Sequence, residues 1–220
     1  ENLRTSFATD AGSVQSVRGI TFHVGKGESL GIVGESGCGK STTGRSILGL
    51  VKPDSGEILY KGQDLTRLSD SEFRPLRRDL QMVFQDTLSS LNPRSRVGAL
   101  LEEPLIVQGM KDGEERRQKV MEILGMVGLS DDYYFRYPHE LSGGQVQRLG
   151  IARALIIDPK LIICDEPVSA LDVSIQSQIL NMLTSLQREM NLSLLFISHD
   201  IGVVRYISSR IGVMYLGTLV

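Results

Sequence analysis

The sequence contains no tryptophan, few aromatic residues (5%) and two cysteines, Cys38 and Cys164. Two cysteines cannot form a disulfide framework, so this usage is typical of a protein that folds in a reducing cytoplasm. Basic and acidic residues nearly balance, and the formal net charge is −2. Bulk charge therefore gives no indication of a nucleic-acid partner.

Long apolar runs are also missing from the sequence. No stretch reaches the roughly 18–20 apolar residues that a membrane-spanning helix needs, and we find no signal peptide. Any membrane function would therefore need a separate membrane protein. The sequence starts at Glu1 rather than at methionine, and Val220 closely follows the strand-like IGVMYLG, so we expect both ends to belong to a longer chain.

Strand patterns alternate with helix patterns along much of the 220 residues. This alternation predicts an α/β fold with a largely parallel sheet covered on both faces. A β-hairpin is predicted within 55–65, with Lys61-Gly62 at its turn. The predicted strands are 20–24, 29–33, 81–85, 161–164, 192–198 and 211–215, and the predicted helices run from about 39 to 52, over 174–190 and near 201–207.

Between residues 86 and 155 the glycine-rich loops give way to helical patterns. We therefore predict one domain over 1–220, with a core made of 1–85 and 156–220 and an inserted helical subdomain at 86–155. One predicted helix carries on a single face Arg116, Val120, Ile123, Leu124 and Val127.

The segment GESGCGKS at 34–41 fits the phosphate-loop pattern G-x-x-x-x-G-K-[ST] between a buried strand and a helix. In such a loop the backbone N–H groups and the helix N-terminus converge on phosphate. We predict that Lys40 bridges the β- and γ-phosphates of ATP, that Ser41 ligates Mg²⁺ and that Thr42 reaches the α-phosphate. An ordinary glycine-rich turn is the alternative. Cys38 is interpreted as a small space-filler, although thiolate character is favoured at a helix N-terminus. The predicted ATP-binding residues here are Gly34, Glu35, Ser36, Gly37, Cys38, Gly39, Lys40, Ser41 and Thr42.

Two adjacent acids, Asp165 and Glu166, end the apolar strand LIIC. Ligands of a parallel sheet bind beyond the carboxyl ends of its strands, so both acids are expected at the edge that holds the phosphate loop. Neighbouring strand residues point to opposite faces, which favours Asp165 as a Mg²⁺ ligand and Glu166 as the base that activates water. Gln85 is expected at the same edge, where its amide would contact metal or the attacking water. The alternative is a solvated acidic turn before Pro167.

The segment LSGGQ at 141–145 precedes another apolar helix. Ser142 is a good N-cap, but a cap does not explain Gly143 and Gly144, each of which costs a helix about 1 kcal/mol. Glycines at a helix start let an anion approach the free N–H groups. Because residues 34–42 already bind this chain's triphosphate, we expect Ser142, Gly143, Gly144 and Gln145 to bind the γ-phosphate of another subunit.

These motifs, together with SALD at 169–172 and His199, resemble the ATPase subunit of ABC transporters over nearly the whole chain. The segments RRDLQMVFQD, SSLNPR, RYPHELSGGQ and DEPVSALDVSIQSQ look like the branch that imports oligopeptides and dipeptides. The resemblance implies a P-loop NTPase fold with a mostly parallel sheet, an antiparallel β subdomain and the helical insertion. It also implies a head-to-tail dimer of like or unlike subunits that holds two ATP molecules between phosphate loops and opposing signatures.

The resemblance further assigns His199 a γ-phosphate contact and Asp172 a role across the dimer interface. A lone histidine at a strand end is more often a structural hydrogen-bonding residue, and this alternative stays open. Phe7, followed by a short insertion through Gly12, occupies the position of the family's adenine-stacking aromatic, although it could equally be a core residue. The implied partners are membrane permeases and, through them, an extracytoplasmic solute-binding protein, with the ATPase peripheral on the cytoplasmic face of the membrane.

The chain departs from the family at a few positions. Val146 replaces the basic residue that commonly follows LSGGQ, and we expect it to weaken polar contacts between subunits. Thr87 stands where the importer branch usually has proline. The family's C-terminal extension is absent from this sequence, which puts dimerisation of the fragment in doubt. The alternative functions are uptake of nickel or another small solute and a non-transport ABC ATPase, which usually carries long coiled-coil inserts or two cassettes.

Overall fold

The computed structural model describes residues 1–9 and 12–220 and centres on a six-stranded sheet with the order β10-β9-β3-β8-β7-β6. Neighbouring strands from β9 to β6 are parallel, whereas β10 runs antiparallel to β9. The predicted, largely parallel sheet is therefore confirmed. Its strands are β3 (Ser29–Val33), β6 (Leu80–Val83), β7 (Leu161–Asp165), β8 (Ser193–Ser198), β9 (Arg210–Tyr215) and β10 (Thr218–Leu219).

Two small antiparallel sheets flank the central one. The first pairs β1 (Leu3–Thr9) with β2 (Gly12–Ile20), and the second pairs β4 (Leu59–Tyr60) with β5 (Gln63–Asp64) around the predicted turn. The predicted strand at 20–24 is wrong, because β2 ends at residue 20. Ile20 pairs with Leu3, the first residue of β1, and the preceding Asn2 leaves the extended conformation (φ 49°) and donates its N–H to the side chain of Thr21 instead of to a strand backbone.

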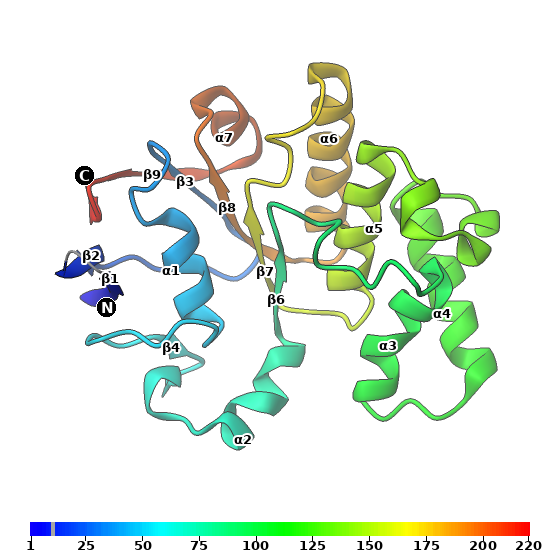
Figure 1. The fold of residues 1–220 in the computed structure, drawn as a ribbon, viewed down its shortest axis with the longest axis horizontal. Helices are drawn as coiled ribbons and strands as arrows, with labels where there is room; N and C mark the ends of the chain where they lie inside the picture. The colour runs from blue at the N-terminus through cyan, green and yellow to red at the C-terminus, as the bar shows by residue number, and fades with distance from the viewer. Residues whose placement is uncertain (10–11) are drawn as a thin grey trace.

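Helices cover both faces of the central sheet, and strand β8 shows how the two cores are separated (Figure 1). Its Leu194 and Phe196 belong to the core on one face, together with α5 (Gly143–Leu155), α6 (Val173–Glu189) and α7 (Ile201–Ile207). The alternate residues Leu195 and Ile197 belong to the core beneath α1 (Lys40–Ile47). This alternation is what a strand buried on both sides requires.

Helix α1 ends at Ile47, earlier than predicted, because Gly49 adopts a left-handed backbone conformation (φ 66°). A glycine in this conformation is a common way to end a helix. Helices α6 and α7 match their predicted ranges closely.

Residues 86–155 contain helices and loops but no strand: α3 (Val97–Val107), α4 (Gly113–Met126), α5 and two 3₁₀ turns at Asp131–Phe135 and Pro138–Glu140. The apolar face predicted for α4 is buried, and its Arg116 pairs with Glu102 of α3 at 3.2 Å. Whether this region behaves as a separate subdomain stays a prediction. Short helical segments also lie at Leu65–Arg67, Asp70–Phe73 and Arg74–Arg78. None of the helices in the described ranges is long and apolar enough to cross a bilayer.

Candidate functional site

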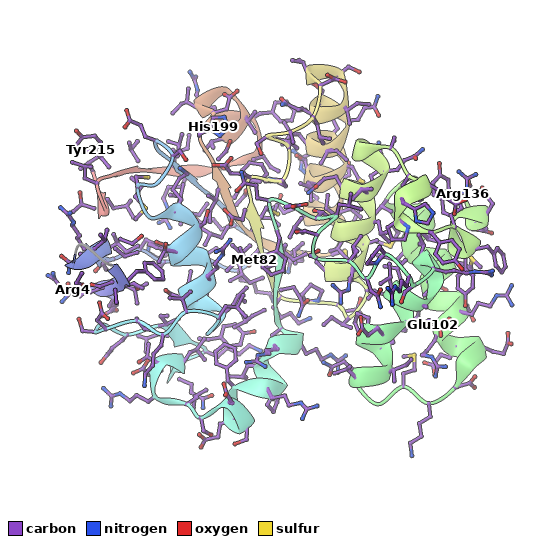
Figure 2. All side chains as sticks on the ribbon, in the orientation of Figure 1. Arg4, Met82, Glu102, Arg136, His199 and Tyr215 are labelled. Carbon is purple, nitrogen blue, oxygen red and sulfur yellow. The ribbon has the colours of Figure 1, made fainter. Side chains whose placement is uncertain are left out.

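The register of the parallel strands brings several predicted residues to one edge of the sheet. Val33 pairs with Ser198, and Asp165 pairs with Ile197. The phosphate loop, Glu166 and His199 directly follow these strand ends, and Gln85 lies two residues beyond the end of β6. Figure 2 shows His199 at this edge, beside α7.

A cavity of about 810 Å³ opens at this edge. Most of the residues that line it were predicted from the sequence as ATP-binding or catalytic: Gly34, Glu35, Ser36, Gly37, Gly39, Lys40, Ser41, Thr42, Gln85, Glu166 and His199. The remaining lining residues, Ser16, Val33, Ile201 and Val213, were not anticipated.

The phosphate loop is packed so tightly that two of its glycines leave no room for a side chain. A Cβ at Gly39, whose φ is 105°, would lie 2.2 Å from the carbonyl oxygen of Ser16, and one at Gly34 would lie 2.1 Å from that of Met214. Lys40 folds back over the loop, and its Nζ donates to the carbonyls of Gly34 (2.8 Å) and Glu35 (2.7 Å). Because Gly39 is the N-cap of α1, no side chain blocks the first N–H groups of that helix.

Cys38 is buried and does not line the cavity, as expected of a space-filling residue. Its carbonyl accepts a hydrogen bond from the N–H of Gly217 (3.1 Å), which fastens the loop to the turn after β9.

Asp165 and Ser41 form a pair that fits a small divalent cation. The Ser41 hydroxyl donates to Asp165 Oδ1 (2.7 Å), while the buried Oδ2 has no hydrogen-bond partner among the described groups. Burial raises the pKa of the Asp165 carboxyl, and the hydrogen bond from Ser41 opposes this rise. An orphaned carboxylate oxygen beside a hydroxyl is the oxygen-rich donor set that Mg²⁺ prefers. Gln85, the third predicted metal ligand, instead contacts Glu166.

Glu166 lies directly after β7 with a positive φ of 47°, and its N–H is bonded to the carbonyl of Ile197 (2.9 Å). Such a conformation is strained for a residue other than glycine and turns the side chain out of the strand's alternation. Glu166 Oε2 accepts from Gln85 Nε2 (3.3 Å) and lies 3.1 Å from His199 Nδ1. A carboxylate only accepts, so Nδ1 carries a proton and Nε2 is left for another partner.

The LSGGQ residues do not line this cavity. Helix α5, which they begin, covers the opposite face of the sheet from α1 (Figure 1). Ser142 and Gly143 are exposed, and the N–H of Ser142 donates to Gln145 Oε1 (2.9 Å). Gln145 Nε2 in turn donates to the hydroxyl of Tyr133 (2.6 Å), a contact that the sequence did not suggest. Val146 is buried in the core, so it presents no surface for polar contacts with another subunit.

Two further predicted residues also lie outside the cavity lining. Asp172 is exposed at the start of α6. Phe7 is 43% exposed on β1 opposite Val14, which rules out a core role, and its contact with adenine stays a prediction. The insertion that follows Phe7 includes Asp10 and Ala11, which lie outside the described residues.

Ser16 shows what the sequence reasoning missed. Its hydroxyl lies 3.0 Å from that of Thr42, so β2 supports the phosphate loop from outside the motif. The available sequence signal was the alternation of side chains between the two faces of β2. The irregular pairing of β2 with β1 interrupts that alternation.

Residues 17–169 match the model of the ABC transporter family. Two curated relatives are oligopeptide transport ATP-binding proteins. The chain is 56% identical to AppF of Bacillus subtilis, with 97% of this chain and 65% of AppF covered. It is 53% identical to OppF of Haemophilus influenzae, with 99% of this chain and 66% of OppF covered. The chain thus spans slightly less than two thirds of the length of these relatives.

Solved structures of ABC cassettes share the whole fold. The dimeric structure of MJ0796, a bacterial ABC transporter cassette, matches with a TM-score of 0.91 and 33% identity, covering 100% of this chain and 94% of that one. A second dimeric structure of MJ0796, a post-hydrolysis state bound to ADP and Pi, matches with a TM-score of 0.90.

Proposed function

The chain belongs to the ABC transporter family, and from this premise we propose that it is the ATP-hydrolysing motor subunit of an importer for oligopeptides or dipeptides. The observation that carries the proposal is the single cavity that collects the phosphate loop, Gln85, Glu166 and His199. The names of the relatives at 53–56% identity support the peptide cargo.

The phosphate loop and the buried carboxylate supply the binding chemistry for ATP and Mg²⁺. Backbone N–H groups at the start of α1 and the ammonium of Lys40 bind the triphosphate. To do so, the Lys40 ammonium gives up its hydrogen bonds to the carbonyls of Gly34 and Glu35 and donates to phosphate oxygens instead. Ser41 and Asp165 hold Mg²⁺, which neutralises charge on the phosphate oxygens when bound. Glu166 accepts the proton of the attacking water, while Gln85 and His199 orient its carboxylate.

A second subunit completes the site in this proposal. The two glycines of the signature, of which Gly143 is exposed, begin a helix that covers the other face of the sheet, and neither lines this chain's own cavity. A head-to-tail dimer would place Ser142, Gly143, Gly144 and Gln145 of one protomer over the γ-phosphate bound by the other, with Asp172 at the interface. The dimeric state of two solved structures of the related cassette supports the presence of a second subunit.

A groove along the edge strand β6 is the proposed contact with a permease. Its volume is about 240 Å³, and the segment 88–104, which follows Gln85, contributes Ser90, Leu91 and Pro104 to its lining. Leu88, in the same segment, is 50% exposed. Through such a permease the chain would act at the cytoplasmic face of the membrane, with a solute-binding protein delivering the peptide from the other side.

The first experiment measures nucleotide binding and hydrolysis by the complete protein. We expect Mg²⁺-dependent ATP hydrolysis, and we expect Lys40→Ala to lose nucleotide binding itself because it removes the cation that compensates the triphosphate charge. Lys52→Ala, at an exposed site outside the loop, is the control. Undiminished ATP binding by Lys40→Ala would contradict the assignment of the loop.

The second experiment tests transport in vesicles that contain the permeases. We expect ATP-driven uptake of a labelled oligopeptide, whereas uptake of nickel but not of peptide would favour the alternative cargo. Leu88→Asp should weaken peptide-stimulated hydrolysis and leave basal hydrolysis unchanged. Leu59→Asp, which changes an equally exposed leucine on β4, should change neither peptide-stimulated nor basal hydrolysis.

A further inference from the structure

Thr87 lies two residues beyond Gln85 and is buried. Its hydroxyl donates to Gln147 Oε1 (2.9 Å) and is 3.1 Å from the carbonyl oxygen of Phe84. A hydroxyl has one proton to give, so these two acceptors share it.

Gln147 carries the contact into α5, the helix that begins with the signature glycines. Its side chain is buried, and its Nε2 has no hydrogen-bond partner among the described groups. Three residues further along α5, a Cβ at Gly150 would lie 2.4 Å from Thr87 Cγ2, so the threonine methyl packs directly on the helix backbone. Thr87 is therefore joined to α5 through both its hydroxyl and its methyl group.

The same short segment also reaches the carboxylate of the cavity. Gln85 Nε2 donates to Glu166 Oε2, which lies beside His199. Glu166 contacts Gln85, two residues of backbone lead from Gln85 to Thr87, and Thr87 contacts Gln147, four residues after Gly143. The bond between Thr87 and Gln147 is buried and favours one arrangement, because sliding the two segments apart leaves an unpaired polar group in the core.

We propose that Thr87 is a positioning residue that keeps α5, and with it the signature, aligned with Gln85 and Glu166. The inference rests on the proposed function, in which the signature serves the nucleotide of the partner protomer. Thr87 does not line the cavity that contains the phosphate loop and Glu166. It links the two half-sites that one protomer contributes to the dimer, the signature and the cavity with Glu166. Closure of the signature over the partner's nucleotide thereby positions Glu166, which acts on the nucleotide bound by its own protomer.

The test compares Thr87→Val with Thr87→Ser in the complete protein. Valine keeps the shape and removes the hydroxyl, whereas serine keeps the hydroxyl and loses the methyl. We expect Thr87→Val to lower kcat about tenfold while the Kd for ATP changes by less than about twofold. The reason is that this contact aligns the groups needed for hydrolysis and does not itself bind ATP. Thr87→Ser, which keeps the hydroxyl, should retain most of the kcat of the unmutated protein. Thr184→Val, which removes a hydroxyl bonded within α6, is the matched control and should leave kcat unchanged.

A double variant shows whether the bond to Gln147 is responsible. Gln147→Met should reproduce the loss of kcat, and Thr87→Val combined with Gln147→Met should lose no more than either variant alone. The assignment is overturned if kcat of Thr87→Val matches the control, if Thr87→Ser is equally slow, or if the two losses multiply. Absence of hydrolysis by the unmutated protein would overturn the proposed function itself, whereas normal hydrolysis with an unaffected Thr87→Val would overturn this assignment alone.

Discussion

At the scale of single residues, Asp165 combines a buried charge with a functional position. Burial raises the pKa of its carboxyl above the ordinary value of 3.8. The folded protein therefore holds this proton more tightly than the unfolded chain does. The resulting destabilisation is absent well below pH 3.8, grows as pH rises through 3.8 towards the raised pKa, and is complete only above that raised pKa.

Asp165→Asn should consequently stabilise the nucleotide-free protein at pH 7 and remove the response to Mg²⁺. For the unmutated protein, ligand at about 100 times its Kd adds about 2.7 kcal/mol to the free energy of unfolding, and we expect the variant to lose most of this gain. Thermal denaturation with and without Mg²⁺ and nucleotide measures both effects. The control is Asp70→Asn, at a fully exposed carboxylate. A lower melting temperature without nucleotide would argue against this account.

Glu166→Gln tests the base at the neighbouring position. The amide keeps the size of the side chain but cannot accept the proton of water, so we expect ATP to bind and kcat to fall about 10²- to 10⁴-fold. Steady-state hydrolysis and equilibrium binding separate the two effects. Glu122→Gln, at the side chain that accepts from Gln118 on the exposed face of α4, should hydrolyse normally. A Glu166→Gln protein that still turns over at the normal rate would refute the assignment of the base.

At the scale of elements, the start of α5 separates folding from function. A Cβ at Gly143 would meet Leu171 at 3.5 Å, an ordinary contact, and the backbone there is not left-handed. The glycine is therefore not required by packing within this chain, and alanine would favour the helix by up to about 1 kcal/mol. Its presence is explained if a bulky anion approaches the helix N-terminus.

Gly143→Ala should thus melt at the same or a higher temperature but hydrolyse ATP at least about tenfold more slowly, because the methyl group occupies the path of the partner's phosphate. Calorimetry and steady-state kinetics check the two halves of this expectation. Gly125→Ala is the matched control, since a Cβ at that position of α4 meets nothing within 4 Å. If both variants hydrolyse ATP alike, Gly143 has no role at a phosphate.

At the scale of the whole molecule, the sheet separates the two halves of the proposed site. The phosphate loop leads into α1 on one face, whereas the signature begins α5 on the other (Figure 1). A protein that must bring these halves together needs a second copy or a similar subunit. Nucleotide should therefore control the oligomeric state.

We expect the complete protein carrying Glu166→Gln to have the mass of two protomers in ATP and of one protomer without it. Adding Gly143→Asp should abolish the ATP-dependent dimer. An acid in the first turn of a helix favours folding, yet it repels the phosphate. Light scattering measures the mass, and thermal denaturation confirms that the double variant is folded. An ATP-dependent dimer that survives Gly143→Asp would contradict the composite site.

The sequence determined the chemistry that depends on neighbours within a short segment. The phosphate loop, the two acids where β7 ends and the two glycines that begin α5 were all singled out from the sequence, because the roles predicted for them depend on local backbone geometry at a strand end or helix start. The buried strands and the long amphipathic helix α6 were also predicted correctly, since their side-chain periods report which faces are covered.

Other features depend on residues far apart in the chain, and only the tertiary structure decided them. The end of β2 at Ile20 follows from where its partner strand begins, and the support of Thr42 by Ser16 follows from how that hairpin packs. The contact between Thr87 and Gln147 joins residues that are 60 positions apart. Such contacts leave no period or motif in the sequence, because they form only when separate elements pack together. They decide how each motif is oriented relative to the rest of the molecule.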